Sequence, residues 1–295
     1  QKFGKQQGKY YVPQRAAAGL DPWATPQAYD NAKDFFDTGI TWSNSLNVAQ
    51  MLDKSSYSIS LGNTHQDGII SSTGMDRYNV KVSADTKLTN NWSSGFTANY
   101  ITTSIDKAVT SGNGLLRTVY AAPPSYDLAG IPSHVDGNPY TQNSFRGSFD
   151  NAYWAMENNK FTEDTNRFFG NVYASYQTDF GTTNHKLNAK YMVGVDAYTT
   201  HYVDSYGYGS NTGGGRGQIE NYGWTNATYN SLLTINYDWH INEDWGLNAV
   251  VGNEIIQSNR KKYYEYGTNY NFPGWNHINN ATTQQTEEET WKNRT

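Results

Sequence analysis

Residues with reactive or metal-binding side chains are dispersed along this chain. It has six histidines: His65, His134, His185, His201, His240 and His277. None of them belongs to an HExxH motif or shows the paired spacing that is typical of a zinc site. We therefore predict no metal site.

Three other patterns match enzyme motifs only in part. Glu157 and the Glu163-Asp164 pair could mimic the two carboxylates of a glycosidase, but carboxylates in a polar loop are usually solvated. Residues 213–217 (GGGRG) lack the Lys-Ser/Thr pair of a phosphate loop, and residues 286–290 (TEEET) lack the glycine of a calcium loop. The sequence predicts no catalytic residue and no cofactor.

Recognition chemistry is better represented, because the chain contains 24 Tyr and 9 Trp. Both residues join an apolar ring to a polar tip, which suits sugar-binding surfaces and membrane–water interfaces. Four aromatic residues in expected long loops are candidates for contact with a substrate: Tyr153, Trp154, Trp224 and Trp275. The alternative is that these rings pack the loops against one another.

The composition narrows the class of protein. The chain has 295 residues and no Cys, so it forms no disulfide and no thiolate metal site. Its net charge is −5 and its basic residues are scattered, so we expect no nucleic-acid partner. No apolar run approaches the roughly 20 residues of a transmembrane helix, but a transmembrane β-strand needs only about 9–11 residues with every second one apolar.

Alternation of apolar and polar residues predicts about eight strands. In residues 231–254, Leu233 and Ile235 fall on one face of a strand, and Thr234 and Asn236 fall on the other. The predicted strands cover residues 41–51, 55–63, 77–88, 94–104, 167–180, 186–198, 231–240 and 245–254.

The connections alternate between short and long. Short polar turns are expected at 53–55, 89–91, 181–184 and 242–244, and long loops near 65–75, 106–165, 200–227 and from 262 onward. In an up-and-down sheet all short turns then lie at one end, as in outer-membrane barrels with short periplasmic turns and long extracellular loops. The aromatic residues beside the short turns would form a periplasmic girdle: Trp92, Phe180, Trp239 and Trp245.

We predict an all-β fold, a transmembrane antiparallel up-and-down β-barrel with its apolar face toward lipid and its polar face toward a wet lumen. The apolar rows hold modest residues, and the strands are longer than the roughly 5–6 residues usual in soluble sheets. Two alternatives stay open. One is a soluble aromatic-rich carbohydrate-binding β-protein, and the other is a small self-closed outer-membrane barrel.

Residues 28–100 resemble one family in the order and spacing of several motifs. These are FFDTG at 35–39, DKSSY at 53–57, QDGII at 66–70 and MDRYN at 75–79. Residues 116–118 (LRT) running into 122–124 (APP) resemble the helical loop of the same family. The chain is similar to the SusC/RagA-type TonB-dependent outer-membrane transporters of Bacteroidetes.

The resemblance implies an internal segment of a barrel of about 22 strands. Residues 1–40 would be an extracellular loop with a short helix, residues 41–262 the barrel segment, and residues 263–295 the start of a further extracellular loop. The plug and the TonB-contacting region are expected outside these residues. The implied function is nutrient import across the bacterial outer membrane, of glycans or oligopeptides, with TonB, a SusD-type surface lipoprotein and outer-membrane lipid as partners.

Overall fold

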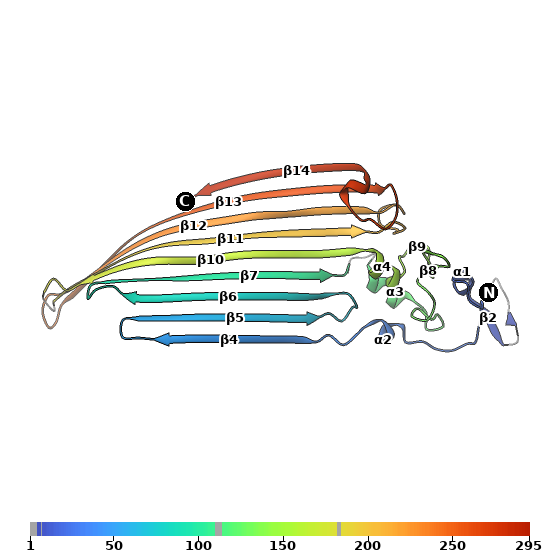
Figure 1. Cartoon of the computed structure of the whole chain (residues 1–295), viewed down its shortest axis with the longest axis horizontal. Coiled ribbons are helices and arrows are strands. Elements are labelled where there is room, and N and C mark those ends of the chain that lie inside the picture. The colour runs from blue at the N-terminus through green and yellow to red at the C-terminus, as the bar shows by residue number, and fades with distance from the viewer. Residues whose placement is uncertain (1–4, 7, 110–113, 182–183) are drawn as a thin grey trace.

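The computed structural model describes residues 5–6, 8–109, 114–181 and 184–295. Nine strands form one antiparallel up-and-down sheet in the order β14-β13-β12-β11-β10-β7-β6-β5-β4 (Figure 1). Their bounds are β4 Thr41–Met51, β5 Ser55–Asp67, β6 Gly74–Lys87, β7 Trp92–Lys107, β10 Lys160–Thr178, β11 His185–Tyr206, β12 Gln218–His240, β13 Gly246–Tyr270 and β14 Ala281–Arg294.

Two of the predicted loops are largely strand. Residues 263–295 do not begin a loop, because β13 continues to Tyr270 and residues 281–294 form the ninth strand. The predicted long loop at 200–227 is mostly strand, and the connection is limited to residues 207–217. In both places the strands carry polar residues on both faces, so no apolar alternation marks them.

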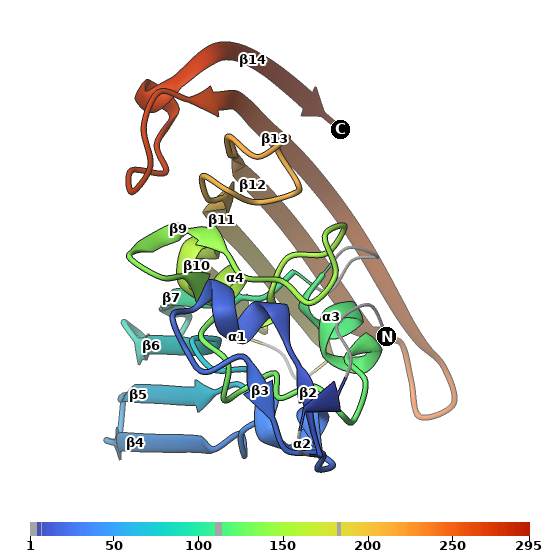
Figure 2. The ribbon, with the colours of Figure 1, turned by 90° about the vertical axis from the view of Figure 1, so that its right-hand side faces the viewer.

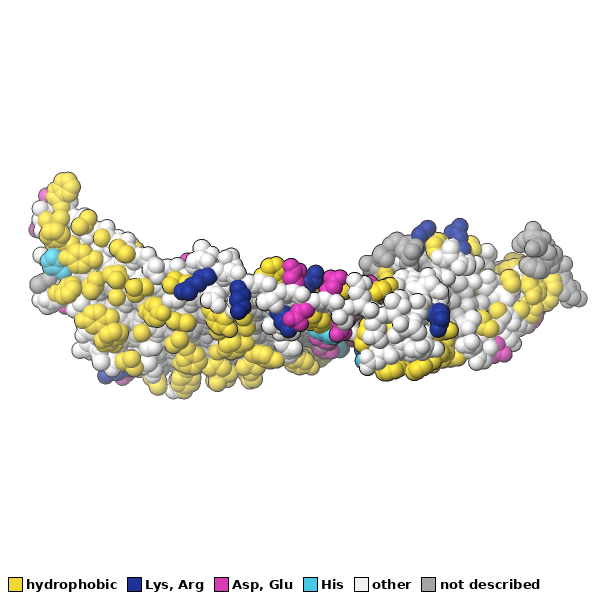
Figure 3. Space-filling view, turned by 90° about the horizontal axis from the view of Figure 1, so that it is seen from above, with side chains coloured by type: hydrophobic (Ala, Val, Ile, Leu, Met, Phe, Trp, Pro, Cys, Tyr) yellow, Lys and Arg dark blue, Asp and Glu magenta, His cyan; other side chains and the backbone are white. Residues whose placement is uncertain are grey.

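The sheet has one apolar face and one polar face. Register places Leu61, Val80, Tyr100 and Phe168 in one row on the same side of four neighbouring strands. All four side chains are exposed. Hydrophobic side chains of this kind spread over one face of the turn half of the sheet in Figure 3. We call this side the apolar face and the opposite side the polar face.

The apolar residues form a band that crosses the rows of paired residues diagonally. On β13 the row of Phe168 is occupied by Asn259, and the apolar residues Leu247 and Val251 lie nearer the turn. The strands lengthen in the same direction, from 11 residues in β4 to 25 in β13. A diagonal band is expected for strands that tilt relative to a membrane, as they must in a barrel. The described part of β14 lies beyond this band, which explains its polar sequence.

The short turns are closed by their own side chains. The Thr89 hydroxyl accepts hydrogen bonds from the backbone N–H groups of Asn91 and Trp92. The Asn242 side chain accepts hydrogen bonds from the backbone N–H groups of Asp244 and Trp245. Such contacts fix a turn locally, which suits connections with no core behind them. Within the predicted turn at 181–184, residues 182 and 183 lie outside the described part.

Segments far apart in sequence pack into a unit beyond the loop ends of the strands (Figures 1 and 2). We call it the loop domain. It contains the helices α1 Pro13–Ala17, α2 Asn31–Phe35, α3 Leu115–Ala121 and α4 Ala152–Asn158. Its buried core joins Val12, Phe35, Ile70, Val119 and Leu128. None of the described helices is long and apolar enough to span a membrane.

A buried carboxylate ties the loop domain to the β11–β12 connection. Asp150 accepts hydrogen bonds from Gln142 Nε2 at 2.7 Å, from the Ser210 hydroxyl at 2.6 Å, and from the backbone and side-chain N–H groups of Asn211 at 2.8 Å. Gly209 has a φ of 102°, and a Cβ atom there would collide with the Tyr140 carbonyl oxygen and would lie 3.2 Å from the indole ring of Trp154. The glycine-rich connection therefore has a defined conformation.

Candidate functional site

The polar face carries a row of tyrosines near its loop end. Register places Tyr202, Tyr222 and Tyr264 side by side on β11, β12 and β13. The rings of Tyr202 and Tyr222 are parallel, with centroids 4.8 Å apart, and Tyr264 follows at 6.5 Å. Trp224, one step nearer the turn end, lies 5.5 Å from Tyr202. The sheet thus holds four rings in fixed positions on its polar face, and we call this set the aromatic row.

Cations of the chain already lie against two of these rings. Lys107 Nζ is 4.6 Å from the centroid of Tyr202, and the Arg260 guanidinium is 5.3 Å from Trp224. Lys107 also pairs with Glu163 at 3.4 Å. Ring faces attract cations through the negative potential above the π-system. The aromatic row can therefore bind a cation as well as stack against a flat apolar ligand.

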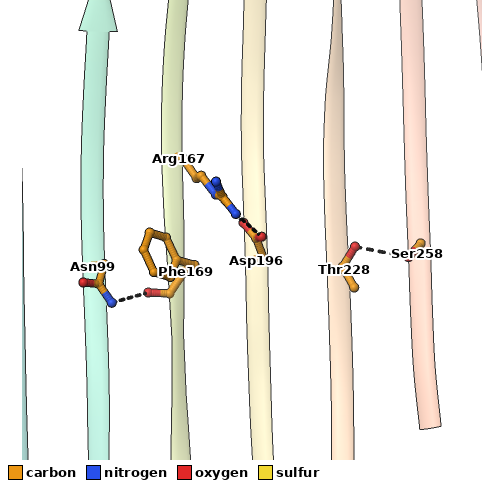
Figure 4. A network of polar contacts seen from close by, with 6 residues as sticks. All are labelled: Asn99, Arg167, Phe169, Asp196, Thr228 and Ser258. Atoms are coloured by element: carbon orange, nitrogen blue, oxygen red, sulfur yellow. Dashed lines mark hydrogen bonds and ion pairs between the residues drawn. The ribbon is translucent and has the colours of Figure 1, made fainter. Parts of the chain in front are cut away.

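Nearer the middle of the sheet, the polar face holds a network of charged and polar groups (Figure 4). Arg167 donates two hydrogen bonds to Asp196, at 2.8 and 2.5 Å, and its guanidinium lies 5.0 Å from the ring of Phe169. Asn99 donates a hydrogen bond to the Phe169 carbonyl at 3.4 Å. The fork geometry of the Arg–carboxylate pair fixes both side chains against the sheet.

This network borders a hollow of about 740 Å³. Lys81, Asn99, Phe169, Asp196 and Asn230 are among the residues that line it, and they come from five strands of the polar face. Gly194 also lines it, and a side chain there would collide with Asn230. The polar face is thus concave and offers donors, acceptors and one aromatic ring, the mixture found in sites for polar organic ligands.

A second hollow of about 440 Å³ lies between the loop domain and the sheet. Met156 and Leu115 line it from the loop domain, and Lys107 and Phe161 line it from the strands. Because Lys107 borders this hollow and also contacts Tyr202, the hollow and the aromatic row are adjacent.

The four predicted substrate contacts do not form one site. No ring contact joins them among the described residues. Trp154 is wrong as a contact, because it is fully buried in the loop-domain core and its indole N–H donates to the Pro139 carbonyl. Trp224 is not in a loop but on β12, within the aromatic row.

Tyr153 and Trp275 remain candidate contacts. The Tyr153 ring packs at 5.3 Å against Phe35, and its hydroxyl donates to the Asp34 carbonyl at 3.2 Å. Burial, together with the charge of Asp34, raises the pKa of Tyr153. Trp275 is exposed in the β13–β14 connection and stacks on His277.

The four residues predicted for the girdle lie beside the short turns. Trp92, Phe180, Trp239 and Trp245 are all exposed there. The Trp92 ring packs on Tyr176 at 4.9 Å, and the Trp239 ring stacks on His185 at 5.6 Å. Their placement in a membrane interface stays a prediction.

The aromatic row was missed from sequence, although a signal for it exists. The predicted strand 186–198 places even-numbered residues on the polar face, and continuing that parity reaches Tyr202. The predicted strand ends where the apolar alternation ends, so the prediction did not extend to Tyr202. In the described ranges, no group of three or more His, Asp or Glu could hold a metal ion.

Three solved structures have the same fold as this chain, and each is a transporter-type barrel. One is the RagAB peptide importer in its closed-closed state, with a TM-score of 0.69, 15% identity, and coverage of 90% of this chain. Another is the RagAB peptide transporter, with a TM-score of 0.72, 14% identity, and coverage of 91% of this chain. The third is the RagAB peptide importer in its open-open state, with a TM-score of 0.73, 15% identity, and coverage of 91% of this chain.

This chain spans 30% of the length of each of those chains. No family model matches it, and no curated protein matches it by sequence. The all-β class with an antiparallel barrel segment, predicted from the sequence, is confirmed. The family resemblance predicted from residues 28–100 is supported at the level of the fold.

Proposed function

We propose that this chain is part of a TonB-dependent outer-membrane importer for oligopeptides or glycans. The observation that carries the proposal is the pairing of two faces on one sheet. An exposed apolar band follows the turn ends diagonally across the strands, and the opposite concave face is lined by charged, amide and aromatic side chains. A soluble sandwich would cover its apolar face with a second layer.

The loop domain supports the direction of transport. It packs at the end of the sheet opposite the short turns, where long loops face the outside in outer-membrane barrels. It borders the hollow that also contains Lys107 and Phe161 of the sheet. A solute entering from outside would pass the loop domain first and then reach the aromatic row.

The resemblance and the similar structures support a proposal about the partners. The similar structures are of a peptide importer named RagAB. On that basis we propose a SusD-type surface lipoprotein over the loop domain, TonB contact through another part of the complete protein, and outer-membrane lipid around the apolar face.

The proposal is tested in the native organism. Deletion of the gene should abolish uptake of a fluorescently labelled oligopeptide or glycan mixture, and a protonophore should block uptake in the undeleted strain. The protein should sediment with the outer membrane and co-purify with a lipoprotein. Recovery as a soluble protein without detergent would sink the proposal and favour a soluble carbohydrate-binding protein.

A further inference from the structure

Two carboxylates face each other across neighbouring strands just above the aromatic row. Register places Asp204 of β11 directly opposite Glu220 of β12, two residues nearer the loop end than Tyr202 and Tyr222. Directly opposed residues have Cβ atoms about 4.5–5.5 Å apart, and like charges in such a pair are unfavourable. Both residues are half-buried, so water screens the repulsion less than on an open surface.

The nearby cationic side chains do not pair with Asp204 or Glu220. Lys107 pairs with Glu163 at 3.4 Å, and Lys262 lies opposite Glu289 in the register of β13 and β14. Arg260 lies between the rings of Trp224 and Trp291. In the part of the chain that the structure describes, no cationic side chain lies within ion-pair distance of Asp204 or Glu220.

The carboxylate pair and the aromatic row belong to one surface. The Tyr222 hydroxyl donates to Asp204 Oδ2 at 3.1 Å, so a carboxylate is fixed at the edge of a ring. Ring faces bordered by carboxylates attract ammonium and guanidinium groups, and the positions of Lys107 and Arg260 show that these rings accept cations.

We propose that Asp204 and Glu220, with the rings of Tyr202 and Tyr222, bind an organic cation, a protonated amine or guanidinium carried by the solute. This inference rests on the proposed import function only for the source of the cation. The cation would lie between the two carboxylates and against the tyrosine rings, and it would relieve their repulsion. The site selects solutes by charge before they reach the hollow beside Arg167 and Asp196.

The test uses the complete purified protein in detergent and two matched probes. Nα-acetyl-argininamide carries a guanidinium, and Nα-acetyl-citrullinamide is its neutral isostere. We expect the wild-type protein to bind the arginine probe about tenfold more tightly, measured by saturation-transfer NMR. The double variant Asp204→Asn/Glu220→Gln should bind both probes equally.

The control is Glu254→Gln, which removes a carboxylate from the same face of β13 near its turn end and should keep the tenfold preference. The double variant should also unfold at a temperature no lower than wild type, because it removes a repulsion. Equal binding of the two probes by the wild type would overturn the inference, as would a preference that survives in the double variant. Displacement of the arginine probe by calcium chloride would also overturn it, in favour of a metal site. This test measures binding and not uptake. Its outcome can therefore be told apart from a failure of the import proposal.

Discussion

The Tyr173 hydroxyl on β10 donates a hydrogen bond of 2.6 Å to Asp85 on β6, across the intervening strand β7. Gly95 is the residue of β7 that lies between them in the register. A Cβ atom on Gly95 would collide with Asp85 Oδ1 and would lie 2.7 Å from Cε1 of Tyr173. The glycine thus lets one side chain join strands that are not neighbours.

We expect Gly95→Ala to break this contact and to lower the free energy of unfolding by about 1–2 kcal/mol, the value of a partly exposed hydrogen bond to a charged group. The measurement is urea unfolding of the protein folded in detergent. Gly252→Ala on β13 is the control, since the nearest atom to its Cβ is 3.7 Å away. Equal stability of the two variants would show that the Tyr173–Asp85 contact contributes nothing.

The assignment of faces predicts opposite responses to the same new residue. Val193→Arg places a charge on the apolar face of β11 and should destabilise the folded barrel by about 2–4 kcal/mol in lipid. Asn188→Arg, on the polar face of the same strand, should destabilise the folded barrel much less. Unfolding in lipid bilayers measures both, and equal effects would contradict the assignment.

Asp150 is expected to hold the loop domain in place. Asp150→Ala leaves the donors of Gln142, Ser210 and Asn211 without their acceptor and should destabilise this unit by about 2–4 kcal/mol. Faster proteolysis within residues 207–217 would report the loosening. The control is Asp136→Ala, which changes an exposed residue of the same domain. This variant should be cleaved at the wild-type rate.

Tyr126 makes the stability of the loop domain depend on pH in the alkaline range. Burial, then the charge of Asp127, raises the pKa of Tyr126 above its ordinary value of 10.0. A raised pKa for an acid means that folding favours the neutral form. The resulting stability is complete below pH 10 and is lost as the pH rises above it.

The variant Tyr126→Phe tests this linkage. The buried Tyr126 hydroxyl has no hydrogen-bond partner among the described residues, so its removal should cost little at neutral pH. The variant should keep its loop domain folded to higher pH than wild type, as measured by tyrosinate absorbance and protease resistance. Identical alkaline transitions would assign the loss to other groups, with Tyr153 the first candidate.

The alternation of side chains sufficed to predict the strands that cross the apolar band. Where a strand leaves the band, polar residues occupy both faces, and the sequence of β14 then reads as a loop. For the same reason, the parts of β11 and β12 nearest the loop domain were predicted to be a loop, and Trp224 was predicted to lie in that loop.

The loop domain could not be predicted because its core joins residues such as Val12, Ile70 and Leu128 from three separate segments. No local period relates residues so far apart. Trp154 was chosen for its type, but its burial depends on these contacts. The Asp204–Glu220 pair likewise depends on a register that only the folded sheet defines.

The strands β12 and β13 have 23 and 25 residues, whereas about 9–11 suffice to cross a bilayer. At about 3.4 Å per residue, the excess forms a wall of sheet roughly 40 Å long, measured along the strands, on the loop-domain side of the apolar band. Because each strand in this wall is hydrogen-bonded to its neighbours, the wall can lean only as one plate. In the proposed membrane placement, we expect a slight lean of this wall near the lipid to be magnified at its rim, so that the loop domain moves further than the strands in the membrane.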